Sequence, residues 1–112
     1  MTLRQKQALF ARLLGLLIEE IYARGYEMTL GEGWRPPEMV KIYAADGRGS
    51  GRSLHPDRLA QDLNLFKDGV WLKSTEDHRE IGEWWEKLHP LCRWGGRFND
   101  GNHYSVEHEG RK

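Results

Sequence analysis

Residues 53–66 read SLHPDRLAQDLNLF, and the second half of this stretch has the pattern of a half-buried β-strand. Because side chains alternate along a strand, Leu63 and Leu65 share one face while Asp62 and Asn64 share the other. A carboxylate beside leucines is costly to bury unless it pairs with a cation or binds a metal. This stretch therefore predicts both a strand of a sheet and a candidate site.

The segments on either side predict a mixture of helices and strands. A capping box of Thr2 and Gln5, followed by apolar residues at helical spacing, predicts the first helix. The expected elements are, in chain order, a helix over residues 2–24, a strand over 26–30, a helix over 36–45, a flexible basic loop over 47–52, strands over 59–66 and 70–72, a helix from Ser74 or Thr75 to before Pro90, and a strand over 103–106. These elements follow no βαβ rhythm, so the predicted fold class is α+β, with helices flanking an antiparallel sheet.

The composition limits the kinds of protein that this chain can be. It has 112 residues, with 17 Lys and Arg against 17 Asp and Glu, and a net charge of zero. This length predicts one small domain over 1–112. Proteins that bind nucleic acid usually carry a basic surplus or stripe, so a nucleic-acid partner is not expected. Cys92 is the only cysteine, which excludes an internal disulfide and a thiolate zinc cluster.

The N-terminal region resembles neither a signal peptide nor a membrane anchor. Arg4, Lys6 and Arg12 interrupt its apolar residues, and no stretch approaches the roughly 20 apolar residues of a membrane helix. We therefore expect a monomer that is synthesised in the cytoplasm without a signal peptide and has no integral membrane segment. If its substrate lies outside the membrane, another factor has to release the protein.

Residues 94–104 read WGGRFNDGNHY and form a second polar cluster, in which Asp100 precedes His103 by three residues. Together with His55 and Asp62, His103 completes a set of two histidines and one carboxylate. This set is common in catalytic zinc sites, where the fourth position is left for a water that the ion activates. A carboxylate that is not a ligand can accept the proton of that water. Dispersed residues of these types also occur without a metal, so the spacing alone leaves the question open.

Three strings resemble segments of one known enzyme family. SLHPDRLAQDLN resembles the Ser-x-His, then Ala-x-Asp signature of the zinc D-alanyl-D-alanine carboxypeptidase and L-alanyl-D-glutamate endopeptidase family. That family includes bacterial D,D-carboxypeptidases, D,D-dipeptidases and many phage endolysins. WGGRFNDGNHYS resembles its second signature, and GEGWRPPEM resembles the segment that carries a catalytic arginine. The matches run in the family's order from about residue 26 to 106.

The resemblance implies a D-Ala-D-Ala carboxypeptidase or hedgehog-like zinc peptidase fold, and it assigns roles to individual residues. It makes His55, Asp62 and His103 the ligands of one zinc ion. It makes Asp100 the general base and acid, and Arg35 the cation that steadies the substrate carbonyl and its oxyanion.

The resemblance also implies a substrate, the peptide stem of peptidoglycan. Ser53 would be a hydroxyl that either supports a zinc ligand or binds the substrate, and Trp94 would line the cleft near the zinc. The version of the signatures found here is most similar to L-alanyl-D-glutamate endopeptidases of phage or prophage endolysins. A protein of this kind would act on the cell wall after release with the help of a holin. Two alternatives are a D-alanyl-D-alanine carboxypeptidase and a non-catalytic cell-wall-binding module that keeps the zinc site. Ser105, where many relatives have a glutamate, leaves the ligands intact but bears on substrate choice.

Several of these residues also have a purely structural interpretation. Asp62 could pair with Arg58, and Arg35 could pair only with Glu32 or Glu38. Trp94 could belong entirely to the core.

Other residues are expected to have structural roles alone. His78 and His89 are expected to be solvated, at the polar face and the end of a helix whose opposite face is apolar. Cys92 is expected to be a small buried residue.

Overall fold

The structure is a computed structural model that describes residues 1–47 and 52–112. Most of the loop predicted over residues 47–52 therefore lies outside the described residues. The helices are α1 (Leu3–Ala23), α2 (Pro37–Ala45) and α3 (Arg79–Leu88), with short 3-10 turns η1 (His55–Asp57), η2 (Glu76–His78) and η3 (Gly95–Phe98). The strands are β1 (Glu27–Leu30), β2 (Ala60–Lys67), β3 (Val70–Leu72), β4 (Cys92–Trp94) and β5 (His103–Val106).

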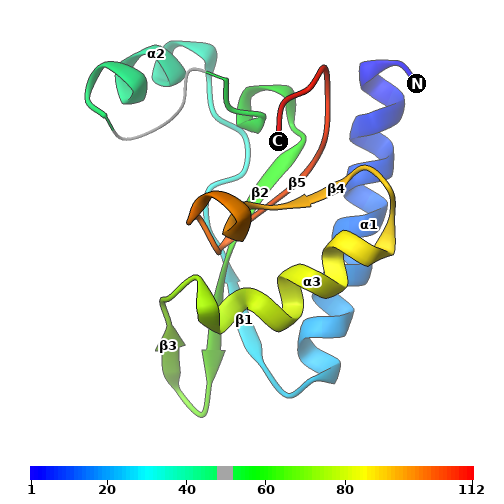
Figure 1. Cartoon of the computed structure of the whole chain (residues 1–112), viewed down its shortest axis with the longest axis vertical. Helices are drawn as coiled ribbons and strands as arrows, with labels where there is room; N and C mark the ends of the chain where they lie inside the picture. Colours follow the sequence, from blue (N-terminus) through cyan, green and yellow to red (C-terminus); the bar gives the residue numbers. More distant parts are fainter. Residues whose placement is uncertain (48–51) are drawn as a thin grey trace.

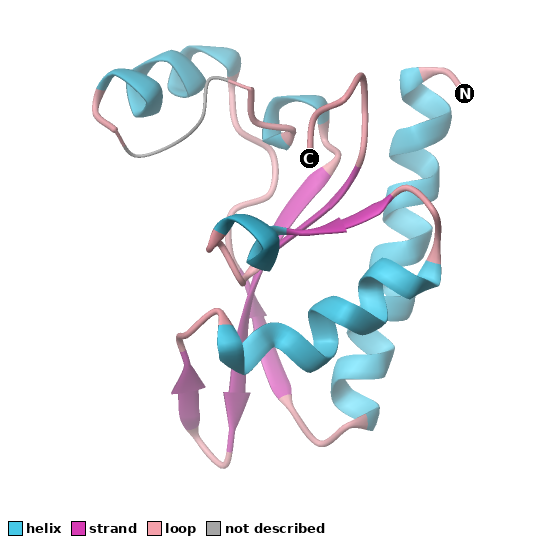
Figure 2. Ribbon diagram, viewed as in Figure 1, coloured by secondary structure: helices cyan, strands magenta, loops and turns pink. Residues whose placement is uncertain are grey.

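Strand β2 organises the antiparallel sheet, because three other strands pair with it. β1 runs along one edge of β2, opposite residues 63–66. β5 and β3 share the other edge, where β5 lies opposite residues 60–62 and β3 opposite residues 65–67. β4 then pairs with the outer edge of β5. The predicted α+β class with an antiparallel sheet and flanking helices is confirmed (Figures 1 and 2).

The core lies between the sheet and the two helices α1 and α3, which also contact each other. Figure 1 shows these two helices close together, whereas α2 stands apart from both and has no buried residue. Each fully buried leucine or isoleucine contributes about 1.5–3 kcal/mol relative to an exposed one. The buried apolar side chains from the helices are Phe10, Leu13, Leu17, Ile21, Ile81 and Trp85.

The helix ends follow their predicted chemistry. Thr2 and Gln5 form the capping box of α1, in which Thr2 Oγ1 accepts from Gln5 N–H and Gln5 Oε1 accepts from Thr2 N–H. Ser74 rather than Thr75 caps the third helical segment, since its hydroxyl accepts a hydrogen bond from Asp77 N–H at 3.0 Å. The first turn of that segment is the 3-10 turn η2, and α3 ends before Pro90 as predicted.

Two expectations about this part of the chain were wrong or incomplete. His78 is not solvated: it is 2% exposed, and its Nδ1 lies 2.9 Å from the hydroxyl of Tyr104. The prediction failed because β5, remote in sequence, covers the histidine's side of the helix. Strand β4 was not predicted, because its three residues are too few to show a period. Cys92 within it is buried, as expected.

The described residues contain no helix that is both long enough and apolar enough to cross a membrane.

Candidate metal centre

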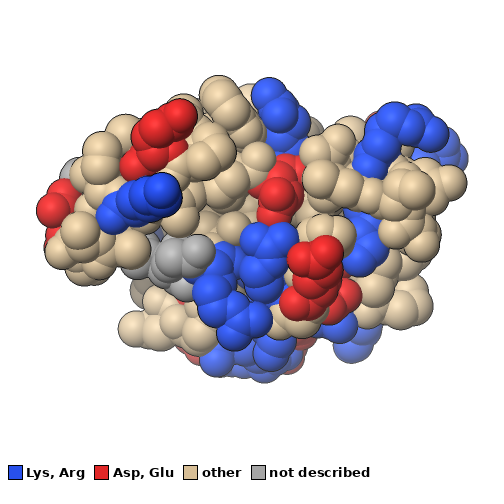
Figure 3. Space-filling model, turned by 90° about the horizontal axis from the view of Figure 1, so that it is seen from above, with Lys and Arg blue, Asp and Glu red and all other residues tan. Residues whose placement is uncertain are grey.

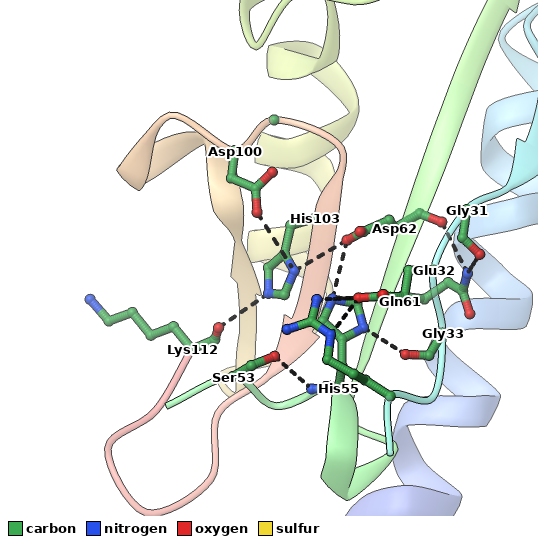
Figure 4. A network of polar contacts seen from close by, with 12 residues as sticks. Gly31, Glu32, Gly33, Ser53, His55, Gln61, Asp62, Asp100, His103 and Lys112 are labelled. Carbon is green, nitrogen blue, oxygen red and sulfur yellow. Dashed lines mark hydrogen bonds and ion pairs between the residues drawn. The ribbon is translucent and has the colours of Figure 1, made fainter. Parts of the chain in front are cut away.

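Three side chains that are distant in the sequence converge at one end of the β2–β5 pair. His55, Asp62 and His103 each offer a ligand atom, and these atoms all lie within 4.8 Å of one another. Oδ1 of Asp62 lies 3.4 Å from Nε2 of His55 and 3.3 Å from Nδ1 of His103. Figure 4 shows a contact from the carboxylate of Asp62 to each of the two imidazoles. The structure therefore brings together the three residues that the sequence singled out.

The backbone fixes the orientation of both histidine rings. Nδ1 of His55 lies 2.6 Å from the carbonyl oxygen of Gly33, and Nε2 of His103 lies 3.2 Å from that of Lys112. A carbonyl can only accept, so each of these nitrogens carries the proton. When the two imidazoles are neutral, the nitrogens that face Asp62, Nε2 of His55 and Nδ1 of His103, carry the lone pairs that a metal ion would bind. Carbonyl partners of this kind commonly orient histidine ligands of metals.

Strand pairing explains why Asp62 and His103 meet. They are direct partners in the antiparallel register of β2 and β5, and their side chains therefore stand on the same face. The chain beyond β1 continues along the other edge of β2, where Gly31 N–H donates to Asp62 O and Asp62 N–H donates to Glu32 O, both at 2.8 Å. Asp62 is thus held between two neighbouring backbones.

His55 reaches the same point from the turn η1 that precedes β2. The hydrophobic residues on either side of this turn, Leu54 and Leu59, are fully buried, and Leu59 N–H donates to Leu54 O at 3.3 Å. Ser53 Oγ accepts a hydrogen bond from His55 N–H at 3.1 Å. Arg58 ends the turn with a left-handed φ of 57°. This closed turn places His55, which is 2% exposed, beside Asp62.

The electrostatics of the cluster favour a charged carboxylate between the imidazoles. Burial opposes ionisation of Asp62, but the hydrogen bonds from His103 and His55 outweigh it and lower its pKa to about 2. Burial also opposes protonation of His55, and here the hydrogen bond and the charge of Asp62 prevail and raise its pKa. The cluster therefore keeps an ionised carboxylate between the two imidazoles, and a cation can bind to it.

Asp100 stands at the rim of the cluster on the turn between η3 and β5. Its Oδ2 lies 4.0 Å from Nδ1 of His103, and about half of its side chain is exposed. Gly95 makes this turn possible, because a side chain there would collide with the carbonyl of Asp100 and with His103 Cβ. Asp100 N–H donates to Gly95 O at 2.8 Å. Desolvation on the wall of the cleft, with a contribution from the charge of Asp62, raises the pKa of Asp100.

Arg35 lines the same cleft as Asp100 and the three metal-ligand candidates. Its Nε donates to Oε1 of Glu32 at 2.8 Å, and its Nη2 donates to the same oxygen. Its guanidinium carbon also lies 4.9 Å from the centre of the Tyr43 ring. The pairing with Glu32 that the sequence allowed is therefore present. The same Glu32 oxygen is 3.9 Å from Nε2 of His55, so the pair borders the metal cluster.

A cleft of about 590 Å³ contains the whole arrangement. Arg35, Ser53, Asp100 and the three metal-ligand candidates line it, together with Arg52, Phe98, Gly110, Arg111 and Lys112. Figure 3 shows lysine and arginine side chains gathered on one face of the molecule, with a few acidic groups among them. Because Ser53 is one of the lining residues, it lies beside the metal cluster, as expected for a residue that contacts a substrate.

Trp94 does not line this cleft, which corrects the expectation for that residue. It is 1% exposed, and its indole N–H donates to the carbonyl of Gly101 at 2.7 Å. The indole also fills the space beside Gly82 and Gly96, where added side chains would overlap it. Trp94 therefore supports the turn that carries Asp100 from inside the core instead of touching a substrate.

The donor set of the cluster fits a zinc ion. Two neutral imidazole nitrogens and one carboxylate oxygen are typical ligands of catalytic zinc, and fewer than four protein ligands leave a position for a substrate or water. Both candidate histidines are buried and already oriented by carbonyls. The cleft leaves the three ligand candidates accessible to water and to a substrate.

Two parts of the site were not placed beside the metal cluster by the sequence. Glu32 lies three residues before Arg35, and that charge pairing at short range was the only signal for its place here. The segment 110–112 lines the cleft because Arg111 forms an ion pair with Asp57 at 2.7 Å. No sequence pattern indicates such a contact between distant segments.

The fold resembles two peptidases of known structure. The L-Ala-D-Glu endopeptidase ChiX of Serratia marcescens superposes with a TM-score of 0.70 at 19% identity, covering 88% of this chain and 77% of ChiX. The D,D-pentapeptidase VanY of a VanB-type vancomycin resistance cassette, determined in complex with Zn(II), gives a TM-score of 0.53 at 20% identity, covering 87% and 70%. The chain has the fold of these peptidases. No protein-family model matches the sequence, and no curated protein is significantly similar to it.

Proposed function

We propose that this protein is a zinc-dependent peptidase that hydrolyses the peptide stem of peptidoglycan, as an L-alanyl-D-glutamate endopeptidase of endolysin type. The observation that carries the proposal is the convergence of His55, Asp62 and His103 in one cleft that Asp100 and Arg35 also line. The shared fold with ChiX and VanY supports the same class of reaction.

In this proposal His55, Asp62 and His103 hold the zinc. When bound, the ion supplies a Lewis acid that polarises the substrate carbonyl and makes a water more acidic. The carbonyls of Gly33 and Lys112 keep the two imidazoles aimed at the centre of the cluster. Pre-oriented ligands of this kind need no rearrangement when the substrate arrives.

Asp100 handles the proton of the reaction. A water oxygen adds to the carbonyl carbon of the peptide bond, and Asp100 accepts the proton that the water loses. The carbon–nitrogen bond then breaks, and Asp100 gives this proton to the leaving nitrogen, so that the products are a carboxylic acid and an amine, which then share the acid's proton as a carboxylate and an ammonium. The half-exposed carboxylate at the rim of the cleft can reach both the water and the leaving group.

Arg35 steadies the negative charge that develops on the carbonyl oxygen when the water adds. Two of its N–H groups are used by Glu32, and both point to the same carboxylate oxygen. A guanidinium has five N–H donors, so the remaining ones are available to a substrate. Glu32 holds the guanidinium group of Arg35 in place at the edge of the cleft.

Product analysis together with metal analysis tests the proposal. Purified protein is assayed for bound zinc and then incubated with purified muropeptides. Release of a new D-glutamyl amino terminus supports the endopeptidase reaction, whereas release of free D-alanine supports the D-alanyl-D-alanine carboxypeptidase instead. A zinc-loaded protein that binds peptidoglycan without releasing any amino group would be a binding module, and the proposal would be wrong.

A further inference from the structure

A second cavity lies in a break of the sheet beyond Asp100. β5 ends its pairing with β2 at Asp62, and β3 begins its pairing at Leu65, on the same edge of β2. Leu63 and Asn64 of β2 lie between these two pairings, and no described strand pairs with them on this edge. One hydrogen bond remains there, from Leu63 N–H to Asn102 O at 2.8 Å. A cavity of about 200 Å³ opens at this break.

This cavity continues the candidate active site along the same face of the sheet. Asp100 lines both cavities, so the two meet at the proposed general base. Asn64, which lines the second cavity, lies two residues after Asp62 in β2, and side chains two residues apart share one face of a strand. A substrate bound at the metal cluster can therefore extend past Asp100 into the break.

The lining of the second cavity suits a polar, extended chain. The Nδ2 of Asn64 donates to Thr29 Oγ1 at 3.2 Å, which leaves its carbonyl oxygen as an acceptor. The side-chain amide of Asn102 makes no hydrogen bond to any described residue and offers both a donor and an acceptor. Amide groups of this kind match the N–H and C=O groups of a peptide backbone.

The same lining includes a cation and an aromatic ring. Nζ of Lys73 lies 4.8 Å from the centre of the Trp71 ring and forms no ion pair with a described residue. Trp71 is 50% exposed, and its ring stacks on Phe66 at a centroid distance of 6.4 Å. Trp71 and Phe66 therefore hold Lys73 at the edge of the cavity with its charge available to an anion.

The direction of the reaction decides which part of a substrate faces this cavity. In the proposed reaction Arg35 binds the carbonyl oxygen, and Asp100 donates a proton to the leaving nitrogen. The segment that carries this nitrogen must lie at Asp100, and the second cavity lies beyond it. We propose that this cavity binds the peptide segment that follows the cleaved bond, with Asn64 and Asn102 on its backbone and Lys73 on one of its carboxylates.

This inference rests on the proposed function and narrows it. A carboxypeptidase releases one amino acid and needs little room beyond the leaving nitrogen. An endopeptidase has to hold several residues there, and an acidic residue after the bond would meet Lys73. The substrate class is then a peptide with an acidic residue and a further segment on the amine side of the cleaved bond.

A series of synthetic peptides tests this assignment. The zinc-loaded protein is assayed with N-acetyl-L-Ala-D-Glu, with the same peptide extended by L-Lys-D-Ala, and with the extended peptide carrying amides in place of its carboxylates. We expect kcat/KM to rise with extension and to fall with amidation. Lys73→Gln should raise KM for the acidic extended peptide about three- to fivefold, leave the amidated one unchanged, and leave kcat unchanged. Lys87→Gln, a change of another exposed lysine at the end of α3, is the control and should alter nothing.

A second measurement does not depend on turnover. The fragment D-Glu-L-Lys-D-Ala is titrated into the zinc-loaded protein, and the backbone amide resonances of Asn64, Lys73 and Asn102 are followed by NMR. Shifts confined to these residues and their neighbours are expected, and Lys73→Gln should weaken them.

The outcomes separate this inference from the proposed function. Cleavage that is independent of extension and of Lys73, or release of D-alanine alone from a stem peptide, overturns the inference while leaving a peptidase. If no peptide is cleaved, the proposed function fails and the titration decides alone: shifts at the cavity support the binding site, and their absence overturns it.

Discussion

Asp62 and His103 are direct cross-strand partners in the β2–β5 pair, and Oδ1 of the first lies 3.3 Å from Nδ1 of the second. Strand register alone therefore places two of the three metal-ligand candidates side by side. His55 joins them from the turn before β2, with its ring held by the carbonyl of Gly33. The cluster is rigid because two strands and a closed turn position it.

Removal of one imidazole should abolish zinc binding and the stability that comes with it. We expect His55→Ala to contain no stoichiometric zinc and to lose the increase in melting temperature that zinc gives to the wild type. A ligand present at about a thousand times its dissociation constant stabilises the folded state by about 4 kcal/mol. Metal analysis and thermal unfolding with and without a chelator measure both effects. His89→Ala is the control, because His89 lies outside the cleft. Equal zinc content in the two variants would contradict the assignment.

Loss of the Asp100 carboxylate should stop turnover without releasing the metal. Asp100→Asn keeps the shape of the side chain but cannot accept a proton, so we expect kcat to fall about 10²- to 10⁴-fold with unchanged zinc content. Asp100→Glu keeps a carboxylate on a longer side chain and should retain more activity than the amide variant. Hydrolysis rates on a stem peptide and metal analysis of each variant provide the comparison. Similar rates in Asp100→Asn and the wild type would remove Asp100 from the mechanism.

The charge of Glu32 should matter for the rate through Arg35. Glu32→Gln leaves an acceptor of the same size, but hydrogen bonds to a charged acceptor are stronger by about 1 kcal/mol. We therefore expect kcat to fall about fivefold, with zinc content unchanged. Glu38→Gln, at an exposed position in the first turn of α2, should have no effect. A fall in zinc content instead of kcat would show that Glu32 acts on the metal cluster and not on Arg35.

The buried imidazole of His78 should make the protein less stable in mild acid. Burial lowers the pKa of His78 to about 4, whereas an unfolded histidine titrates near 6.5. Between these values the unfolded chain binds a proton that the folded chain does not, so stability falls as the pH drops from about 6.5 to about 4. The full loss is about 3 kcal/mol. Denaturant unfolding at several pH values should show a smaller loss in His78→Gln than in the control His89→Gln. Identical profiles would mean that His78 titrates normally in the folded state.

Two glycine-to-alanine substitutions should have opposite effects. Gly82 in α3 packs against the indole of Trp94, and a methyl group there would overlap the ring. We expect Gly82→Ala to cost about 1–3 kcal/mol of stability, because overpacking forces the core apart. Gly15 in α1 is exposed, and a methyl group there would meet nothing within 4 Å, so Gly15→Ala should stabilise by about 0.5–1 kcal/mol. Denaturant midpoints of both variants test the pair, and a tolerated Gly82→Ala would mean that Trp94 can move.

The amino-acid sequence by itself determined the helices and strands with long or regular patterns. The capping box and apolar spacing of α1, the alternation of β1 and β2, and the turn before β3 are local properties, and local propensity shows in the chain. The sequence also pointed to His55, Asp62 and His103 as one set, through their residue types and the resemblance of their flanking strings. Strand β4 was not predicted, because three residues are too few to show the alternation of a strand.

Only the tertiary structure decided which side chains lie inside and which line the cleft. The sequence around His78 and Trp94 does not show that either residue is buried. In the structure β5 covers His78, and the turn before β5 covers Trp94. Glu32 lies beside the metal cluster because it approaches His55, which is distant in the sequence. The segment 110–112 lines the cleft because Arg111 pairs with Asp57. Burial depends on what packs against a residue from elsewhere, and that is a property of the folded chain and not of its local pattern.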